Sequence, residues 1–105
     1  MPLEDYLVPG EEIKFQSARP VHYGDARYHV IMTDRRILLF GRRGMFFQND
    51  EIVTQKLDDL HGVRYSEEGL IDKRGTIHLE GRTKMDLSGP APAIKALYQQ
   101  MMAFM

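Results

Sequence analysis

The chain has 105 residues, of which 43% are hydrophobic and 28% charged, and its formal net charge is -1. These values are typical of one globular domain, and the near-neutral charge argues against diffuse nucleic-acid binding, so no DNA partner is expected. The chain contains no cysteine, which excludes disulfides, thiolate zinc sites and cysteine nucleophiles and favours a reducing, cytoplasmic setting. The chain contains no apolar run long enough to predict a membrane-spanning helix.

Short strand-like runs separated by turn residues occupy the first part of the chain. After the Val8-Pro9-Gly10 turn, Ile13 and Phe15 alternate with polar neighbours and predict a strand over 12–16. A loop over 17–27 follows, with a short extended piece at 21–23. Two apolar runs then flank Thr33-Asp34-Arg35, which predicts a β-hairpin with strands over 28–33 and 36–40.

The middle of the chain continues the same pattern. A turn is expected at Gly41-Arg42-Arg43-Gly44, and Asn49-Asp50 is expected to interrupt any extension of the hairpin. Alternating apolar residues predict four more strands, over 51–57, 62–66, 76–80 and 83–87. Short turns are expected between them at 57–60, 67–69 and 81–82.

The periodicity changes at Ser88-Gly89-Pro90, which is typical of a helix start. Apolar residues then recur at three- and four-residue spacing and predict one amphipathic helix of about fifteen residues. These residues are Ile94, Leu97, Tyr98, Met101 and Phe104. The predicted fold is therefore mainly β, with about seven strands and a C-terminal helix that covers the edges and open end of a small antiparallel sheet.

Several of these segments resemble the bacterial pleckstrin-homology-like (PH-like) domains, which are related in shape to GRAM domains. The matching segments are Leu7-Val-Pro-Gly-Glu-Glu-Ile13, 28–38 with its Thr33-Asp34-Arg35-Arg36 turn, 57–63, and the amphipathic C-terminal segment. The resemblance spans nearly the whole chain and implies a single PH-like domain over 1–105. It also implies two near-orthogonal antiparallel sheets, with the helix plugging one end. It does not imply one function, because PH-like domains variously bind phosphoinositides, bind proteins or self-assemble.

A basic and aromatic segment is the first candidate binding surface. Arg42 and Arg43 precede Met45-Phe46-Phe47, and such a loop could dock on an anionic bilayer, where each arginine contributes about 1 kcal/mol. The alternative is that Met45 and Phe47 point inward and the arginines are simply solvated. In the family that the chain resembles, this loop would lie at the same end as two others. The resulting anionic-ligand or lipid patch consists of Arg19, Arg42, Arg43, Phe46, Arg82 and Lys84. In phosphoinositide-binding PH domains a compact basic motif follows the first strand, whereas here Lys14, Arg19 and Arg27 are widely separated.

Other charged residues favour structural roles. Arg35 and Arg36 lie at the far end of their strand, about 20 Å from that patch. They could hold an anionic ligand, but we favour pairing with nearby carboxylates. Adjacent acidic residues such as Glu11-Glu12 point to opposite faces of a strand or cap turns, so they do not suggest catalysis.

No catalytic, metal or cofactor site is expected. The four histidines show no metal-site spacing, and His29 and His78 are expected to be satisfied locally within strands. The chain has no Gly-rich nucleotide loop and no nucleophile elbow.

The C-terminus is the second candidate surface. Met101, Met102 and Phe104 provide more apolar surface than one helical stripe requires, and methionine adapts well to interfaces. A frayed terminus is the alternative. The leading hypothesis is a non-enzymatic binding or scaffolding module that acts through protein–protein contacts or homo-oligomer formation. The alternative is peripheral binding to anionic membrane lipid. A weaker alternative is single-stranded nucleic acid stacked on Phe46, Tyr28 or Tyr65, against which the low net charge counts.

Overall fold

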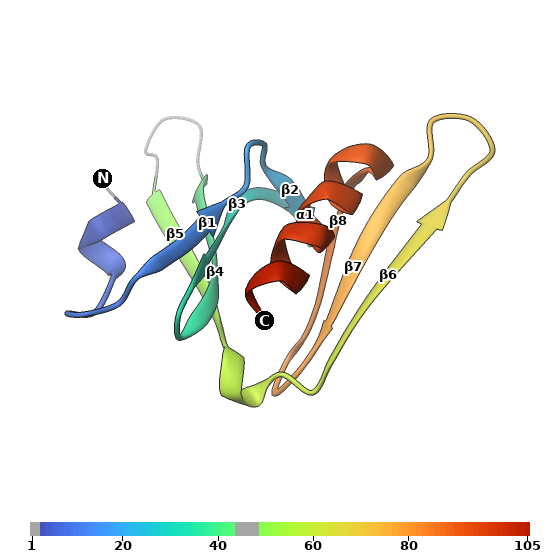
Figure 1. Ribbon diagram of the computed structural model, residues 1–105. Helices are drawn as coiled ribbons and strands as arrows, with labels where there is room; N and C mark the ends of the chain where they lie inside the picture. The colour runs from blue at the N-terminus through green and yellow to red at the C-terminus, as the bar shows by residue number, and fades with distance from the viewer. Residues whose placement is uncertain (1–2, 44–48) are drawn as a thin grey trace.

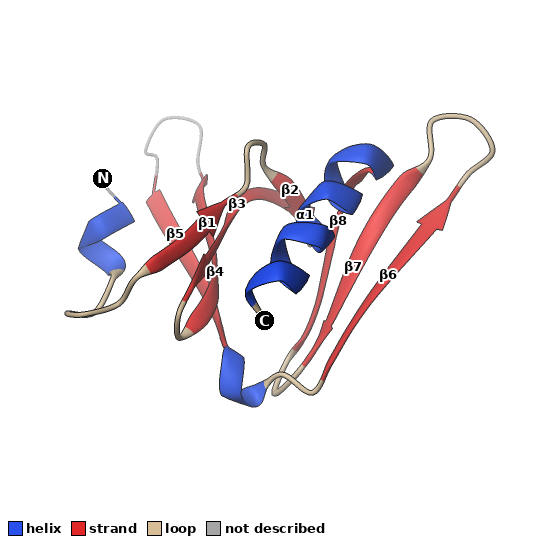
Figure 2. Ribbon diagram, in the orientation of Figure 1, coloured by secondary structure: helices blue, strands red, loops and turns tan. Residues whose placement is uncertain are grey.

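The computed structural model describes residues 3–43 and 49–105. Within these residues the chain is mainly β, with one C-terminal helix (Figures 1 and 2). The predicted fold class is confirmed. The strands are β1 (Ile13–Gln16), β2 (Val21–Tyr23), β3 (Ala26–Thr33), β4 (Arg36–Arg43), β5 (Asn49–Lys56), β6 (Gly62–Glu68), β7 (Arg74–Glu80) and β8 (Lys84–Pro90). The helices are η1 (Leu3–Tyr6), η2 (Leu57–Asp59) and α1 (Ala91–Phe104), of which the first two are short 3-10 helices.

The strands form one continuous antiparallel path in the order β5-β4-β3-β2-β8-β7-β6, and β1 also pairs with β3. β3 belongs to both halves of this path. Its second half pairs with β1 and β4, whereas its first half pairs with β2. β2 in turn pairs with β8, through His22 and Ser88. In Figure 1 the β4–β5 side and the β7–β6 side therefore splay apart, and α1 lies between them.

Several predicted boundaries are wrong because backbone pairing extends the strands. β4 continues to Arg43 and β5 begins at Asn49, so ladder pairs such as Gly41 with Glu51 replace the turn expected over 41–43 and the interruption expected at 49–50. Gly44, the last residue of the expected turn, lies outside the described residues. β8 likewise continues through Ser88 to Pro90, and α1 begins at Ala91. The extended piece expected at 21–23 is the strand β2.

Gly41 lies within β4, and a glycine is needed there because the neighbouring atoms leave no room for a side chain. A Cβ atom at this position would lie 2.7 Å from Cδ1 of Tyr28 and 2.8 Å from the carbonyl oxygen of Arg27. Tyr28 is itself buried. Gly41 therefore marks a close approach between β3 and β4 rather than a turn.

We expect Gly41→Ala to lower the free energy of unfolding by about 1–3 kcal/mol, since the added methyl group overpacks a contact that includes fixed backbone. Gly62→Ala is the matched control, because the three atoms nearest its new Cβ all belong to the Glu80 side chain, the closest being Oε2 at 3.2 Å, and none is backbone. Urea denaturation measures both variants. Equal unfolding midpoints for the two would contradict the close-approach explanation.

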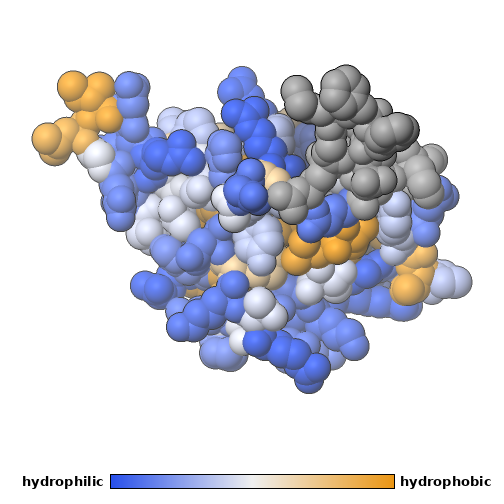
Figure 3. All heavy atoms as spheres, turned by 180° about the vertical axis from the view of Figure 1, so that it is seen from behind, coloured by the Kyte–Doolittle hydropathy of each residue, from blue (hydrophilic) through white to orange (hydrophobic). Residues whose placement is uncertain are grey.

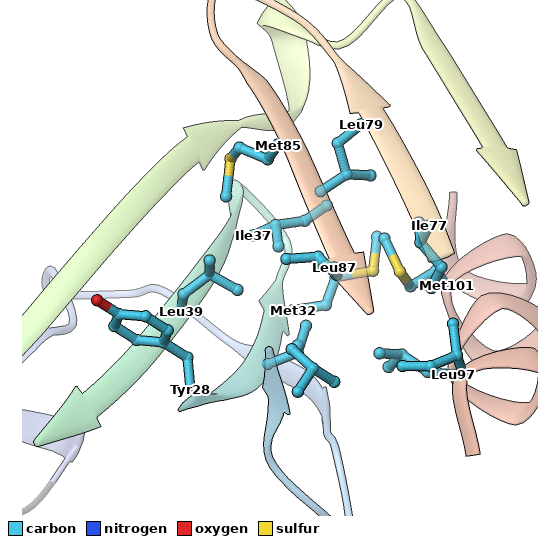
Figure 4. Packing of buried hydrophobic residues seen from close by; sticks show 13 residues of the cluster. Tyr28, Met32, Ile37, Leu39, Ile77, Leu79, Met85, Leu87, Leu97 and Met101 are labelled. Atoms are coloured by element: carbon cyan, nitrogen blue, oxygen red, sulfur yellow. The ribbon is translucent and has the colours of Figure 1, made fainter. Parts of the chain in front are cut away.

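The main core lies between the two halves of the sheet and α1 (Figure 4). The helix contributes Ala91, Ile94, Leu97 and Met101, and most of the predicted apolar stripe is confirmed. Met101 is 0% exposed, so its assignment to a surface interface is wrong. Figure 4 shows Met101 beside Leu97, pointing toward β7 and β8. Its side chain therefore fills part of the core between the helix and the sheet.

A second apolar layer lies on the other face of the β3–β4 hairpin. Ile31 and Leu38 are cross-strand partners and fully buried, yet they are not part of the main core. Neighbouring residues in a strand point to opposite faces. Tyr6 of η1 packs against Phe40 with ring centroids 5.9 Å apart, so the N-terminal segment covers this outer face. This layer explains why the hairpin strands are continuously apolar.

Candidate functional site

The Thr33-Asp34-Arg35-Arg36 turn attaches the N-terminal segment to the β3–β4 hairpin. The Arg36 guanidinium donates from Nε to Glu11 Oε2 at 2.8 Å and from Nη2 to Glu11 Oε1 at 2.9 Å, a bidentate pair. It also donates to the carbonyl oxygen of Tyr6 at 2.6 Å. The Glu11 side chain is 0% exposed and that of Arg36 is 17% exposed. For Arg36, the predicted pairing with a carboxylate is confirmed.

Thr33 completes this Glu11–Arg36 anchor. Its buried hydroxyl donates to Glu11 Oε2 at 2.6 Å and accepts from the backbone N–H groups of Arg35 and Arg36, each at 3.1 Å. The Arg36 hydrogen bonds, with a further one from Thr33, outweigh the effect of burial and lower the pKa of Glu11 to about 2. Because the charged groups satisfy one another, this cluster is a structural anchor rather than a site for an external anion.

The predicted lipid patch is only partly described. Arg19 is exposed on the loop between β1 and β2. The backbones of Arg42 and Arg43 end β4, paired with Asp50 and Asn49. Their side chains, and the whole of Phe46, lie outside the described residues.

Arg82 and Lys84 lie at the opposite end of the molecule, so their grouping with Arg42 and Arg43 is wrong. Arg82 Nε is 3.9 Å from Asp59 Oδ2. Gln55 Nε2 donates to the carbonyl oxygen of Thr83 at 3.5 Å. Gln55 and Asn49 stand near opposite ends of β5, about 20 Å apart, which exceeds the Debye length of about 8 Å. The β7–β8 turn is therefore placed beside η2, and its charges cannot join the patch.

A hydrogen-bonded line of three side chains crosses β6, β7 and β8. Ser66 Oγ lies 2.9 Å from His78 Nε2, and His78 Nδ1 lies 2.8 Å from Asp86 Oδ1. When Nδ1 carries the proton it donates to Asp86, and Nε2 accepts from the Ser66 hydroxyl. The residue types and their order match a nucleophile, a base and an orienting carboxylate.

This line lacks the other parts of an acyl-transfer site. Ser66 is exposed and the Asp86 side chain is 68% exposed, so water competes for every one of these bonds. β7 is paired along both edges, with β6 and with β8, so its N–H groups are not available to stabilise an oxyanion. The three residues form a cross-strand polar network, which confirms that His78 is satisfied locally.

Among the described residues, the most exposed large apolar side chains belong to the β6–β7 loop. Leu70 is 98% exposed and Ile71 is 84% exposed, whereas Phe104 and Met105 are each 50% exposed. Gly69 and Asp72 flank the pair with left-handed backbone, at φ of 104° and 53°, and turn the loop sharply. The tip forms the apolar protrusion at the upper left of Figure 3.

Sequence reasoning gave Leu70 and Ile71 no role. The available signal was an apolar pair between Gly69 and Asp72, outside the alternation of either flanking strand. Large apolar residues are usually buried, so the sequence pattern alone does not distinguish such a pair from the end of a strand.

Two shallow grooves flank the first half of α1. The groove on the side of the β1–β2 loop has a volume of about 470 Å³ and is lined mainly by small or apolar residues with one cation. Its lining includes Ala18, Arg19, Pro20, Val21, Pro92, Ala93, Ala96 and Leu97.

The groove on the β6–β7 side is lined by more charged residues and is crossed by ion pairs. Lys95 Nζ lies 2.9 Å from Glu67 Oε1, which also accepts from the Tyr65 hydroxyl at 2.8 Å. Burial, together with the Glu67 carboxylate, raises the pKa of Tyr65 to about 12. These contacts tie α1 to β6.

The described part of the chain contains no cluster of three or more histidine or acidic residues that could hold a metal ion. None of its helices is long and apolar enough to cross a membrane. No family model, curated protein or solved structure matches the chain.

Proposed function

We propose that this chain is a PH-like, non-enzymatic binding module that acts through protein–protein contacts, including contacts between its own copies. The observation that carries the proposal is the exposure of large apolar side chains at two places, the β6–β7 loop and the last turn of α1. Contiguous exposed apolar surface typically marks an interaction site. The bent antiparallel sheet with its terminal helix supports the PH-like assignment, together with the Thr33–Arg36 hairpin.

The C-terminal surface now consists of Met102, Phe104 and Met105, since Met101 is buried. Phe104 is held in place by Phe15 of β1, with ring centroids 5.8 Å apart. Because Phe15 fixes Phe104 in place, the C-terminal surface can offer a partner an ordered apolar contact. Among the described strands, β6 ends the path and has a strand partner on one edge only, and its other edge is a ready template for an added strand.

The Ser66–His78–Asp86 network does not argue for an enzymatic role, because the neighbouring strands β6 and β8 occupy both edges of β7. The lipid alternative receives no additional support, because Arg82 and Lys84 are separated from the other members of its patch. The exposed apolar side chains therefore favour protein–protein contacts over lipid binding.

Sedimentation velocity over a wide concentration series is expected to show reversible self-association. Met102→Ser combined with Phe104→Ser should weaken it about tenfold, because the partly exposed side chains would lose apolar burial of about 1.4 kcal/mol. Ala103→Ser, between them on the exposed side of α1, is the matched control and should associate as the wild type does. A wild-type protein that remains monomeric at every concentration would contradict self-assembly.

A further inference from the structure

We infer that the β6–β7 loop of one copy inserts Leu70 and Ile71, here called the knob, into the apolar groove between the β1–β2 loop and α1 of a second copy. This inference rests on the proposed function and specifies the two surfaces that meet. A single chain carries both surfaces, and each is suited to the other in size, polarity and charge.

The knob is presented on a loop whose base is held. At that base, the backbone N–H of Ala91 donates to the carbonyl oxygen of Lys73 at 2.9 Å. Lys73 Nζ lies 3.9 Å from Glu67 Oε2. A partner therefore meets two nearly fully exposed aliphatic side chains on a loop with restrained ends, which reduces the ordering cost of binding.

The groove has the volume and lining to accept both side chains. A cavity left by trimming one large aliphatic side chain measures about 150 Å³, and the groove measures about 470 Å³. Prolines and alanines supply much of its surface, including Pro20, Pro92 and Ala93. These side chains have little rotamer entropy to lose on contact.

Charge favours a second copy over an anionic membrane as the occupant. Arg19 lines the groove and is exposed, and within residues 3–43 and 49–105 it forms no ion pair. Glu68 and Asp72 flank the knob and are exposed, whereas Lys73, the residue after Asp72, has its Nζ 3.9 Å from Glu67 Oε2. Insertion of the knob would bring the Glu68 and Asp72 carboxylates toward Arg19, whereas anionic lipid headgroups would repel them.

The knob and the groove lie on opposite sides of α1, as the β6–β7 and β1–β2 loops show in Figure 1. Each copy engaged through its knob therefore keeps a free groove. Such a head-to-tail contact closes into a ring or continues as an open chain.

Two variants separate the knob from the groove in sedimentation velocity experiments. Leu70→Ser with Ile71→Ser removes the knob without touching the core, and Ala93→Glu fills the groove and places a carboxylate where Glu68 and Asp72 would approach. For each variant alone, the self-association constant is expected to fall at least tenfold. An equimolar mixture should recover a one-to-one complex, since one variant retains the groove and the other the knob. Gln99→Glu adds a carboxylate at an exposed position of the same helix outside this groove and away from Met102 and Phe104, so it is the control and should behave as wild type.

The inference is overturned if either variant associates as tightly as the wild type, if the mixture fails to recover the complex, or if Gln99→Glu is equally impaired. If only Met102→Ser with Phe104→Ser impairs association, the proposed function stands and the knob-and-groove contact fails. If the wild-type protein never associates, both self-assembly claims fail together. Circular dichroism of each variant confirms that the loss of association does not reflect unfolding.

Discussion

Arg36→Ala is expected to lower the free energy of unfolding by about 3 kcal/mol, because it leaves a covered carboxylate without its partner. Glu11, whose side chain is 0% exposed, would lose both guanidinium donors. The hydrogen bond from Arg36 to the carbonyl oxygen of Tyr6 would be lost as well, which weakens the attachment of η1 to the hairpin. Urea denaturation monitored by circular dichroism provides the measurement.

Arg35→Ala is the natural control, since Arg35 is the preceding residue in the same turn and is exposed. Surface substitutions of this kind usually change stability by about 0.5 kcal/mol or less. If the two alanine variants unfold at the same urea concentration, the Glu11–Arg36 anchor does not have the stabilising role assigned to it.

The same anchor predicts how stability depends on pH. The pKa of Glu11 is about 2 in the folded protein and ordinarily 4.5, so the unfolded chain takes up this proton first as the pH falls. The stabilisation is therefore complete above pH 4.5 and is lost progressively as the pH falls toward 2. The stability difference between wild type and Glu11→Gln should be largest near neutrality and shrink across this range. A difference that stays constant with pH would show that Glu11 acts through packing alone.

Met101→Ala is expected to cost about 2–5 kcal/mol, whereas Met102→Ala, one residue further along α1, should cost about 0.5 kcal/mol or less. Met101 is 0% exposed and packs in the main core, while Met102 is 38% exposed. Trimming Met101 leaves a cavity where the last turns of the helix meet the sheet. Thermal and urea unfolding of the two variants measure the contrast.

Similar stabilities for Met101→Ala and Met102→Ala would mean that the last turns of α1 do not seal the core. The pair also separates stability from binding. Only Met102 lies on the exposed apolar surface, so Met102→Ala should alter self-association more than it alters unfolding.

The predicted elements succeeded where local periodicity decides the structure. The 28–40 hairpin and the helical stripe of Ile94, Leu97 and Met101 followed from residue spacing alone. Boundaries failed where a paired backbone continues through residues that usually form turns. Gly41 was expected in a turn because glycine permits turns, but here it is required by the nearness of Tyr28.

The candidate surfaces were harder to predict because they depend on contacts between distant segments. Arg82 was grouped with Arg42 from a family resemblance, yet the β7–β8 turn packs beside Asp59. Leu70 and Ile71 carry the same apolar side chains as core residues, and only the completed fold leaves them outside it.

By itself, the sequence determined the mainly β fold, the terminal amphipathic helix and the Arg-bearing hairpin, because these depend on periods of two and of three to four residues along the chain. The tertiary structure decided which charges share an end of the molecule, which methionine is buried and which apolar pair faces solvent. Those outcomes depend on the pairing of β3 with both halves of the sheet, and no local pattern specifies how segments far apart in the chain meet.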